Sequence, residues 1–213
     1  LPICSLPVMG SDEIFQVSNF SVVQGSRELV HDVSLSLHVG EMLAITGANG
    51  VGKSSLLHAL VAKAPLQSIC RLVPENVSSL FITETLEEEL SRADSLAGHK
   101  LSGLTAMTFW SILATEESTE LLSVHPRDLS AGTQVALAIA LQLAWKPQVI
   151  LIDEPTRGLD ALSREAMAEV LRCVAETGTA VLFASHDEAF VSDLGCRVLA
   201  IREGVLVSDE VTA

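Results

Sequence analysis

The stretch Gly47–Ser54, which reads GANGVGKS, decides the fold of this chain of 213 residues. It satisfies the pattern G-x-x-x-x-G-K-[ST], which ordinary residue frequencies produce by chance in about 1% of chains of this length. Glycines let the backbone curl so that successive N–H groups face inward, and a helix that begins here adds the positive end of its dipole. In such a loop Lys53 can reach the β- and γ-phosphates of a nucleotide, and the Ser54 hydroxyl can ligate magnesium.

The segments around this loop predict strands before it and a helix after it. Met42–Ile45 is a compact apolar run, typical of a fully buried strand. Apolar residues at helical spacing over 56–61 predict a helix that stops at Pro65. Upstream, Ile14–Val39 alternates apolar and polar residues, which predicts two or three half-buried antiparallel strands with a turn at Gly25-Ser26.

A second apolar strand, Val149–Ile152, ends in the two carboxylates Asp153 and Glu154. Ligands of open parallel sheets gather at the carboxyl ends of the strands, which places Asp153 beside the phosphate loop as a magnesium partner. Glu154 points elsewhere on the same edge and could polarise an attacking water. The alternative is that two acids merely end a strand, and the nearby phosphate loop disfavours it.

The remaining carboxyl-terminal part alternates strands and helices, which implies a mostly parallel core sheet of the α/β class. We expect a helix over 163–175, a strand over 180–184, a short helix from Glu188, and closing strands over 198–201 and 205–207.

The composition changes over Thr83–Asp128, which is acidic and compatible with helix. We interpret it as a small helical subdomain. The acidic run Glu87–Glu89 is expected to be a solvated helix face rather than a metal site, because consecutive carboxylates point around a helix instead of converging.

The segment Leu129–Gln134, which reads LSAGTQ, precedes an apolar helix expected over Val135–Ala144. One interpretation is an N-cap, in which Ser130 or Thr133 satisfies free N–H groups of that helix. The other is a second anion seat, because a helix N-terminus with a hydroxyl and a close-approach glycine suits phosphate. One chain does not need two such seats for one nucleotide, which suggests that the second serves a nucleotide bound to another subunit.

Together these motifs resemble the nucleotide-binding domain of ABC ATPases. The phosphate loop, Leu129–Thr133, the Ile-Asp-Glu-Pro strand, Gly158-Leu159-Asp160 and His186 occur in that family's order and rough spacing. The resemblance covers about residues 14–209, and in detail it is similar to the ATPase subunits of energy-coupling-factor importers of vitamins and cobalt.

The resemblance implies a P-loop NTPase core with an N-terminal antiparallel β subdomain and an inserted α-helical subdomain. The implied boundaries are a single domain over 12–213, with a β subdomain at 12–40, a core at 41–82 and 129–213, a helical subdomain at 83–128, and an extension at 1–11.

The resemblance also implies a head-to-tail dimer that sandwiches two ATP molecules. Each ATP is held by one phosphate loop and by the signature of the other subunit, while Asp160 crosses the interface. Lys53, Glu154 and His186 would be catalytic, with His186 orienting the attacking water and γ-phosphate; a satisfied histidine at a strand end is the alternative for His186. The implied ATP-binding residues are Gly47, Ala48, Asn49, Gly50, Val51, Gly52, Lys53, Ser54 and Ser55; the signature residues are Ser130, Ala131, Gly132 and Thr133; the Mg²⁺ ligands are Ser54, Asp153 and Glu75.

Three positions depart from the family's pattern. Glu75 stands where relatives carry a magnesium-binding Gln, and Val22 or Val23 stands where a Tyr usually stacks on adenine, in a chain that contains no Tyr. The residues 134–136, Gln-Val-Ala, replace an Arg-rich helix start. These departures favour an altered, weak or asymmetric ATPase, such as one half of a non-equivalent pair.

Composition narrows the function. A formal net charge of −14 argues against nucleic acid or an anionic membrane surface as the main partner, because both demand clustered Lys and Arg. The longest strongly apolar run, Val135–Trp145, is about half the ~20 residues needed to cross a bilayer. Without a spanning run in the sequence, the resemblance implies a cytoplasmic ATPase, peripheral on the inner face of the cell membrane, that pairs with itself or a homologous ATPase and moves a separate integral membrane transport subunit.

The alternatives are a soluble ABC ATPase of translation or DNA repair, and a P-loop kinase. A P-loop kinase would leave the signature and Asp160 without a role. The spacing of 77 residues between Lys53 and Ser130 also excludes the long heptad arms that ABC ATPases of chromosome architecture insert between these two motifs.

Cysteines 4, 70, 173 and 196 form no Cys-x-x-Cys pair, which favours reduced thiols. A first residue other than Met suggests a piece of a longer protein.

Overall fold

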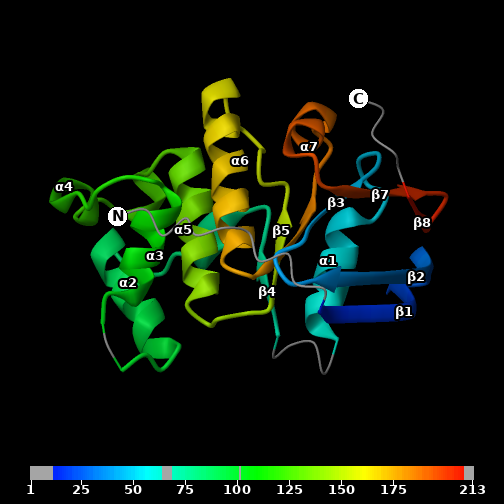
Figure 1. Cartoon of the computed structure of the whole chain (residues 1–213), viewed down its shortest axis with the longest axis horizontal. Helices are drawn as coiled ribbons and strands as arrows, with labels where there is room; N and C mark the ends of the chain where they lie inside the picture. Colours follow the sequence, from blue (N-terminus) through cyan, green and yellow to red (C-terminus); the bar gives the residue numbers. More distant parts are fainter. Residues whose placement is uncertain (1–11, 64–68, 101, 209–213) are drawn as a thin grey trace.

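The computed structural model describes residues 12–63, 69–100 and 102–208, and within them the strands form two sheets (Figure 1). A two-stranded antiparallel sheet comes first, and a six-stranded sheet in the order β4-β5-β6-β3-β7-β8 forms the centre. The six-stranded sheet is parallel except for its edge strand β8. The strands are β1 (Glu13–Gln24), β2 (Arg27–His38), β3 (Met42–Thr46), β4 (Cys70–Val73), β5 (Val149–Asp153), β6 (Ala180–Ala184), β7 (Arg197–Arg202) and β8 (Val205–Ser208).

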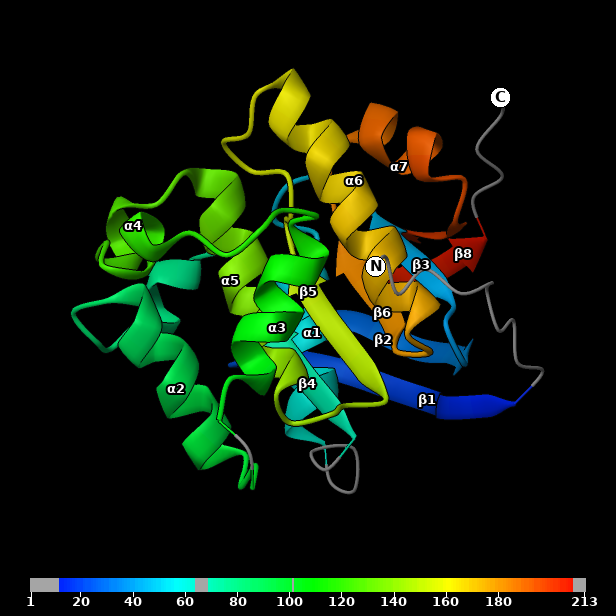
Figure 2. The same cartoon turned by 60° about the vertical axis from the view of Figure 1, so that its left-hand side comes forward.

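Helices cover both faces of the central sheet, and a further group of helices lies at one end of the molecule. Figure 1 shows α2, α3 and α4 gathered at one end of the molecule and the β1–β2 sheet at the other, and the turned view in Figure 2 shows α5 and α6 across one face of the strands. The helices are α1 (Lys53–Ala62), α2 (Leu86–Leu96), α3 (Leu104–Ile112), α4 (Thr119–Leu122), α5 (Ala131–Leu143), α6 (Ala161–Glu176) and α7 (Glu188–Leu194), with 3₁₀ turns η2 (Val77–Leu80) and η3 (Pro126–Asp128).

Two apolar cores lie on the two faces of the central sheet, because side chains alternate along each strand. On β5, Ile150 and Ile152 pack into the core formed with α2, α3, α5 and α6, whereas Val149 and Leu151 face the core formed with α1 and the β1–β2 sheet. All five residues of β5 are buried. The α/β fold predicted from the sequence is confirmed, and the phosphate loop lies where β3 passes into α1.

Most predicted elements occur within one or two residues of their expected ends. Strand β4 was not anticipated, and α5 begins at Ala131 rather than Val135. The segments α2, α3, α4 and η3 fall inside the range expected for the helical subdomain, whose boundaries stay a prediction. Pro65, Cys4 and the extension 1–11 lie outside the described residues. Each helix in the described ranges is too short or too polar to cross a bilayer.

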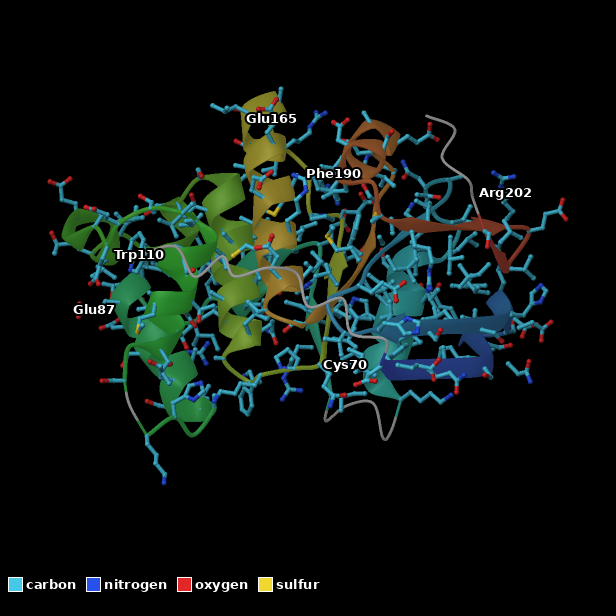
Figure 3. All side chains as sticks on the ribbon, viewed as in Figure 1. Cys70, Glu87, Trp110, Glu165, Phe190 and Arg202 are labelled. Carbon is cyan, nitrogen blue, oxygen red and sulfur yellow. The ribbon has the colours of Figure 1, made fainter. Side chains whose placement is uncertain are left out.

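The acidic run at the start of α2 differs from the expectation of a solvated face. Glu87 points outward at the edge of the molecule (Figure 3) and Glu88 is exposed, but Glu89 is fully buried. Its carboxylate accepts hydrogen bonds from the backbone N–H groups of Ile82 at 2.7 Å and Thr83 at 2.9 Å, and it also pairs with Arg92. The prediction was wrong for Glu89 because the third residue of the run falls on the inward side of the helix, where it anchors the segment before α2.

Candidate functional site

The phosphate loop has the backbone conformation that its glycines allow. Gly47, Gly50 and Gly52 have φ values of 139°, 78° and 113°. At Gly52, which caps α1, an added Cβ would lie 2.9 Å from Cγ2 of the buried Val30. Lys53 is 6% exposed, and its Nζ donates to the backbone carbonyls of Gly47 at 2.8 Å and Ala48 at 3.3 Å. The loop thus curls around its own lysine.

The end of β5 meets the start of α1 at a direct side-chain contact. The Ser54 hydroxyl donates to Asp153 Oδ1 at 3.0 Å, so two residues 99 positions apart lie together as the parallel-sheet argument predicts. Burial raises the pKa of Asp153, and the neighbouring Glu154 charge raises it further, although the Ser54 hydrogen bond opposes this. A cation beside Asp153 would offset that cost of ionisation.

This pair of oxygen ligands fits Mg²⁺ in one particular way. Within the described part of the chain, no group of three or more His, Cys, Asp or Glu side chains is placed to hold a metal ion. Magnesium is usually bound by one or two protein oxygens together with phosphates and waters. Ser54 and Asp153 therefore suit an ion that arrives with a nucleotide rather than one caged by protein alone.

Glu154 lies at the centre of a polar cluster. Its Oε2 is 2.7 Å from His186 Nδ1, its Oε1 is 3.7 Å from Lys53 Nζ, and its side chain is 9% exposed. Its φ of 51° is left-handed, an uncommon conformation for a residue with a side chain. Strained backbone of this kind concentrates at functional sites. The histidine and the lysine hold the carboxylate from two sides.

Glu75 and Arg157 form an ion pair on the same side of the molecule, with side chains 39% and 63% exposed. The sequence indicated Glu75 as a magnesium ligand but gave no role to Arg157. Whether Glu75 also reaches a metal stays a prediction, since its carboxylate contacts a guanidinium here.

One cavity of about 860 Å³ collects these groups. Its wall includes Gln24 and Arg27, which flank the β1–β2 turn, and Leu29 on β2. Val22, by contrast, is buried in the core, Val23 is 60% exposed, and neither is among the lining residues. Its described lining comprises Gln24, Arg27, Leu29, Asn49, Gly50, Gly52, Lys53, Ser54, Ser55, Glu75, Glu154, Thr156, Arg157, Gly158, Leu159, Arg164, His186 and Asp187.

Several lining residues were missed from the sequence. Gln24 and Arg27 flank a turn, Arg157 lies in the irregular segment after β5, and Arg164 lies in the first turn of α6. For Gln24 and Arg27, the departure from the family's pattern at the nearby Val22 and Val23 was the only hint in the sequence. The ring of Phe20, the aromatic side chain on β1 close to Val22, faces Lys63 Nζ at 4.7 Å from its centroid.

The signature segment lies outside this cavity and has the geometry of a helix cap. Ser130 Oγ accepts from the Thr133 N–H at 3.2 Å and lies 2.7 Å from Thr133 Oγ1. Gln134, where the family's pattern expects an Arg-rich start, donates through its amide to the carbonyls of Arg127 and Leu129. The N-cap interpretation therefore holds, and a role toward a second subunit stays a prediction.

Within the single chain Asp160 has a structural role, whereas nothing in the described residues requires a glycine at position 132. A Cβ added to Gly132 would have ordinary contacts, 3.8 Å from Ser163 Cβ and 3.9 Å from Leu159 Cδ2. The exposed Asp160 caps α6 by accepting from the Ser163 N–H at 2.8 Å, and hydrogen bonds from Ser163 lower its pKa. A close approach to Gly132 would have to come from outside the chain.

Comparisons with known proteins agree with this geometry. The sequence model of the ABC transporter family matches residues 30–157. A Streptomyces avermitilis protein named as an ABC transporter ATP-binding protein is 33% identical over 100% of this chain and 40% of its own length. The aliphatic sulfonates import ATP-binding protein SsuB 1 of Paracoccus denitrificans is 32% identical over 91% of this chain and 81% of its own.

The fold is also similar to that of solved structures. CbiO1 from Clostridium perfringens, described as part of the ABC transporter complex CbiONQ, superposes with a TM-score of 0.78 at 21% identity, over 92% of this chain and 88% of its own. The chain spans about two fifths of the length of several relatives that it matches, the Streptomyces avermitilis protein among them.

Proposed function

Because this chain belongs to the ABC transporter family, we propose that it binds ATP with Mg²⁺ and hydrolyses it to drive the movement of a small solute through a membrane transporter. The observation that carries the proposal is the cluster of Lys53, Glu154 and His186 beside the contact between Ser54 and Asp153, all at the carboxyl edge of one sheet.

The residues divide the work by position. Lys53 exchanges its loop carbonyls for phosphate oxygens, and the backbone N–H groups of Gly50 and Gly52 face the same ligand. Ser54 and Asp153 would hold Mg²⁺, which neutralises phosphate charge when bound. Glu154 would polarise the attacking water, and His186, whose Nδ1 lies 2.7 Å from the Glu154 carboxylate, would orient that water and the γ-phosphate.

The proposed assembly extends beyond this chain. Two ATPase units, identical or homologous, would close head to tail over two ATP molecules, each contacted by Ser130–Thr133 of the opposite unit. A membrane subunit would dock near Glu75 and the α2–α4 region, on the inner face of the cell membrane. The names of relatives favour import: that of Paracoccus denitrificans specifies aliphatic sulfonates, and one of Bacillus subtilis specifies HMP and thiamine. The solute carried here is thus proposed to be a vitamin, a metal ion or another small compound.

The test of ATP hydrolysis is the substitution Glu154→Gln. The amide keeps the shape of the side chain but loses the charge that polarises water, so turnover should fall by about 10²-fold or more while ATP affinity is kept. Phosphate release and ATP binding by the purified chain are measured, with Glu165→Gln, an exposed glutamate on α6, as the matched control. Hydrolysis by Glu154→Gln at the parent rate would remove Glu154 from this role.

The test of the transport role is the identity of what binds the chain in cells. Cross-linking in intact cells should recover an integral membrane protein. Recovery of ribosomes or DNA-repair proteins instead would favour the soluble alternative.

A further inference from the structure

We propose that Arg157 is a phosphate-binding residue that exchanges between Glu75 and the terminal phosphate of ATP. This inference rests on the proposed function, because it assigns a further contact within the same cavity. It also gives Glu75 a second role, as the group that competes with the nucleotide for this guanidinium.

The position of Arg157 along the cavity points to the terminal phosphate. Its backbone N–H donates to the carbonyl of Glu154 at 3.1 Å, which ties it to the residue proposed to polarise the attacking water. The β1–β2 turn, with Gln24 and Arg27, lines another part of the cavity wall. A triphosphate seated on Lys53 with its last phosphate toward Glu154 therefore brings that phosphate to the Arg157 side.

The pairing of Arg157 with Glu75 is of a kind that can be exchanged. The two side chains are 63% and 39% exposed, and both line the cavity. Ion pairs at exposed positions contribute about 0–1 kcal/mol, so little holds this one together. A phosphate offers more negative charge than a carboxylate and accepts the planar guanidinium in the same two-pronged way. The nucleotide should thus win the competition.

The fold explains why Glu75 lies beside Arg157. Glu75 follows β4, the neighbour of β5 in the sheet, and Arg157 follows β5, so adjacent strands deliver the two side chains. A neutral Gln, which the family resemblance leads one to expect at position 75, could accept a hydrogen bond from the guanidinium but would leave its charge without an opposite charge. The acid therefore makes release of Glu75 a consequence of ATP binding, and a nucleotide without the terminal phosphate would trigger it less.

The experiment measures dissociation constants of ATP and ADP by calorimetric titration, with Mg²⁺ and again with EDTA, for four full chains: the parent, Arg157→Ala, Glu75→Gln and the double variant. Arg157→Ala should weaken ATP binding about tenfold more than ADP binding. Glu75→Gln should strengthen ATP binding about threefold in EDTA, and this gain should vanish in the Arg157→Ala background. Arg172→Ala, which removes another surface arginine from α6, is the control and should leave both affinities unchanged.

Two results would overturn the inference while leaving the proposed function intact. One is an equal effect of Arg157→Ala on ATP and ADP, and the other is a Glu75→Gln effect of the same size with and without Arg157. A parent chain that binds no ATP would instead overturn the proposed function. Thermal melting of all variants shows that they fold, and Arg157→Gln serves in place of Arg157→Ala if the latter does not.

Discussion

At the scale of single residues, Gly52 is a position in the phosphate loop that leaves no room for a side chain. It combines a φ of 113° with a neighbour, Val30, that is fully buried and stiff at its β-branched carbon. Gly52→Ala should therefore lower the free energy of unfolding by more than backbone strain alone, on the order of 3 kcal/mol in total. Urea denaturation measures the loss.

Gly98→Ala is the matched control for that substitution. Gly98 also has a positive φ, of 72°, but a Cβ there would meet nothing within 4 Å. It should cost about 1–2 kcal/mol, the ordinary penalty of a left-handed residue with a side chain. Equal losses at the two positions would show that Val30 moves aside and that the close contact has no energetic weight.

The residues that the sequence located are those whose positions follow from regular structure. Asp153 and Glu154 end a strand and Ser54 begins a helix, so sheet topology brings them together. Arg27 and Arg157 could not be placed in the same way, because Arg27 lies beside a turn at the start of β2 and Arg157 lies in an irregular segment after β5, and both positions depend on tertiary contacts. The chemistry was readable from the motifs, whereas the polar groups that modulate it were not.

At the scale of the element, α2 depends on one buried carboxylate. Burial alone would raise the pKa of Glu89, but the hydrogen bonds from Thr83, Arg92 and Ile82 outweigh it, and the pKa is lowered from its ordinary value of 4.5. A group with a depressed pKa in the folded state contributes stability that is present above its unfolded pKa and is lost as pH falls through the folded value. The contribution of Glu89 should therefore be complete at neutral pH and disappear below about pH 4.5.

Glu89→Gln tests this dependence. The free energy of unfolding should fall by about 1–3 kcal/mol at neutral pH, because an amide cannot accept all the bonds that the carboxylate accepts. Denaturant titrations of parent and variant between about pH 7 and pH 3 should converge as the pH falls. A difference that stays constant over this range would mean that shape rather than charge holds the segment before α2.

Among the elements, buried strands and helices of clear period were predictable and short paired segments were not. Strands β3, β5 and β6 are continuous apolar runs, and their positions matched. Strand β4, with the sequence CRLV, has only four residues and includes Arg71; its extended form comes from pairing with β5. The local sequence of β4 does not indicate that it pairs with β5, so this strand could be identified only from the structure.

At the scale of the whole molecule, the proposed dimer makes a prediction about Gly132. A side chain there fits within one chain, so its effect should be confined to contact with a second one. In a Glu154→Gln background, which should keep ATP intact, the chain is expected to run as a dimer on size exclusion with ATP and as a monomer without it. Gly132→Asp should abolish the ATP-dependent dimer, because its carboxylate would face the phosphates of the opposite unit.

Gly132→Ala is the control, since a methyl group adds little bulk and no charge; it should weaken the dimer far less than Asp does. Melting temperatures close to the parent's would show that both variants fold. A Gly132→Asp protein that still dimerises with ATP would place the signature away from the nucleotide of the partner.

The pairing of Lys53 with Glu154 and of Arg157 with Glu75 has one more consequence, which concerns the ions released when a nucleotide binds. Release of mobile counter-ions gives a favourable entropy when a polyanion binds cationic side chains, and anions attracted to those side chains can be released in the same way. Here the counter-ions are carboxylates tethered to the chain, so an arriving triphosphate frees none of them into the solvent. At Lys53 and Arg157, therefore, the gain on binding should come from the contacts that the phosphates make and not from anions released into the solvent.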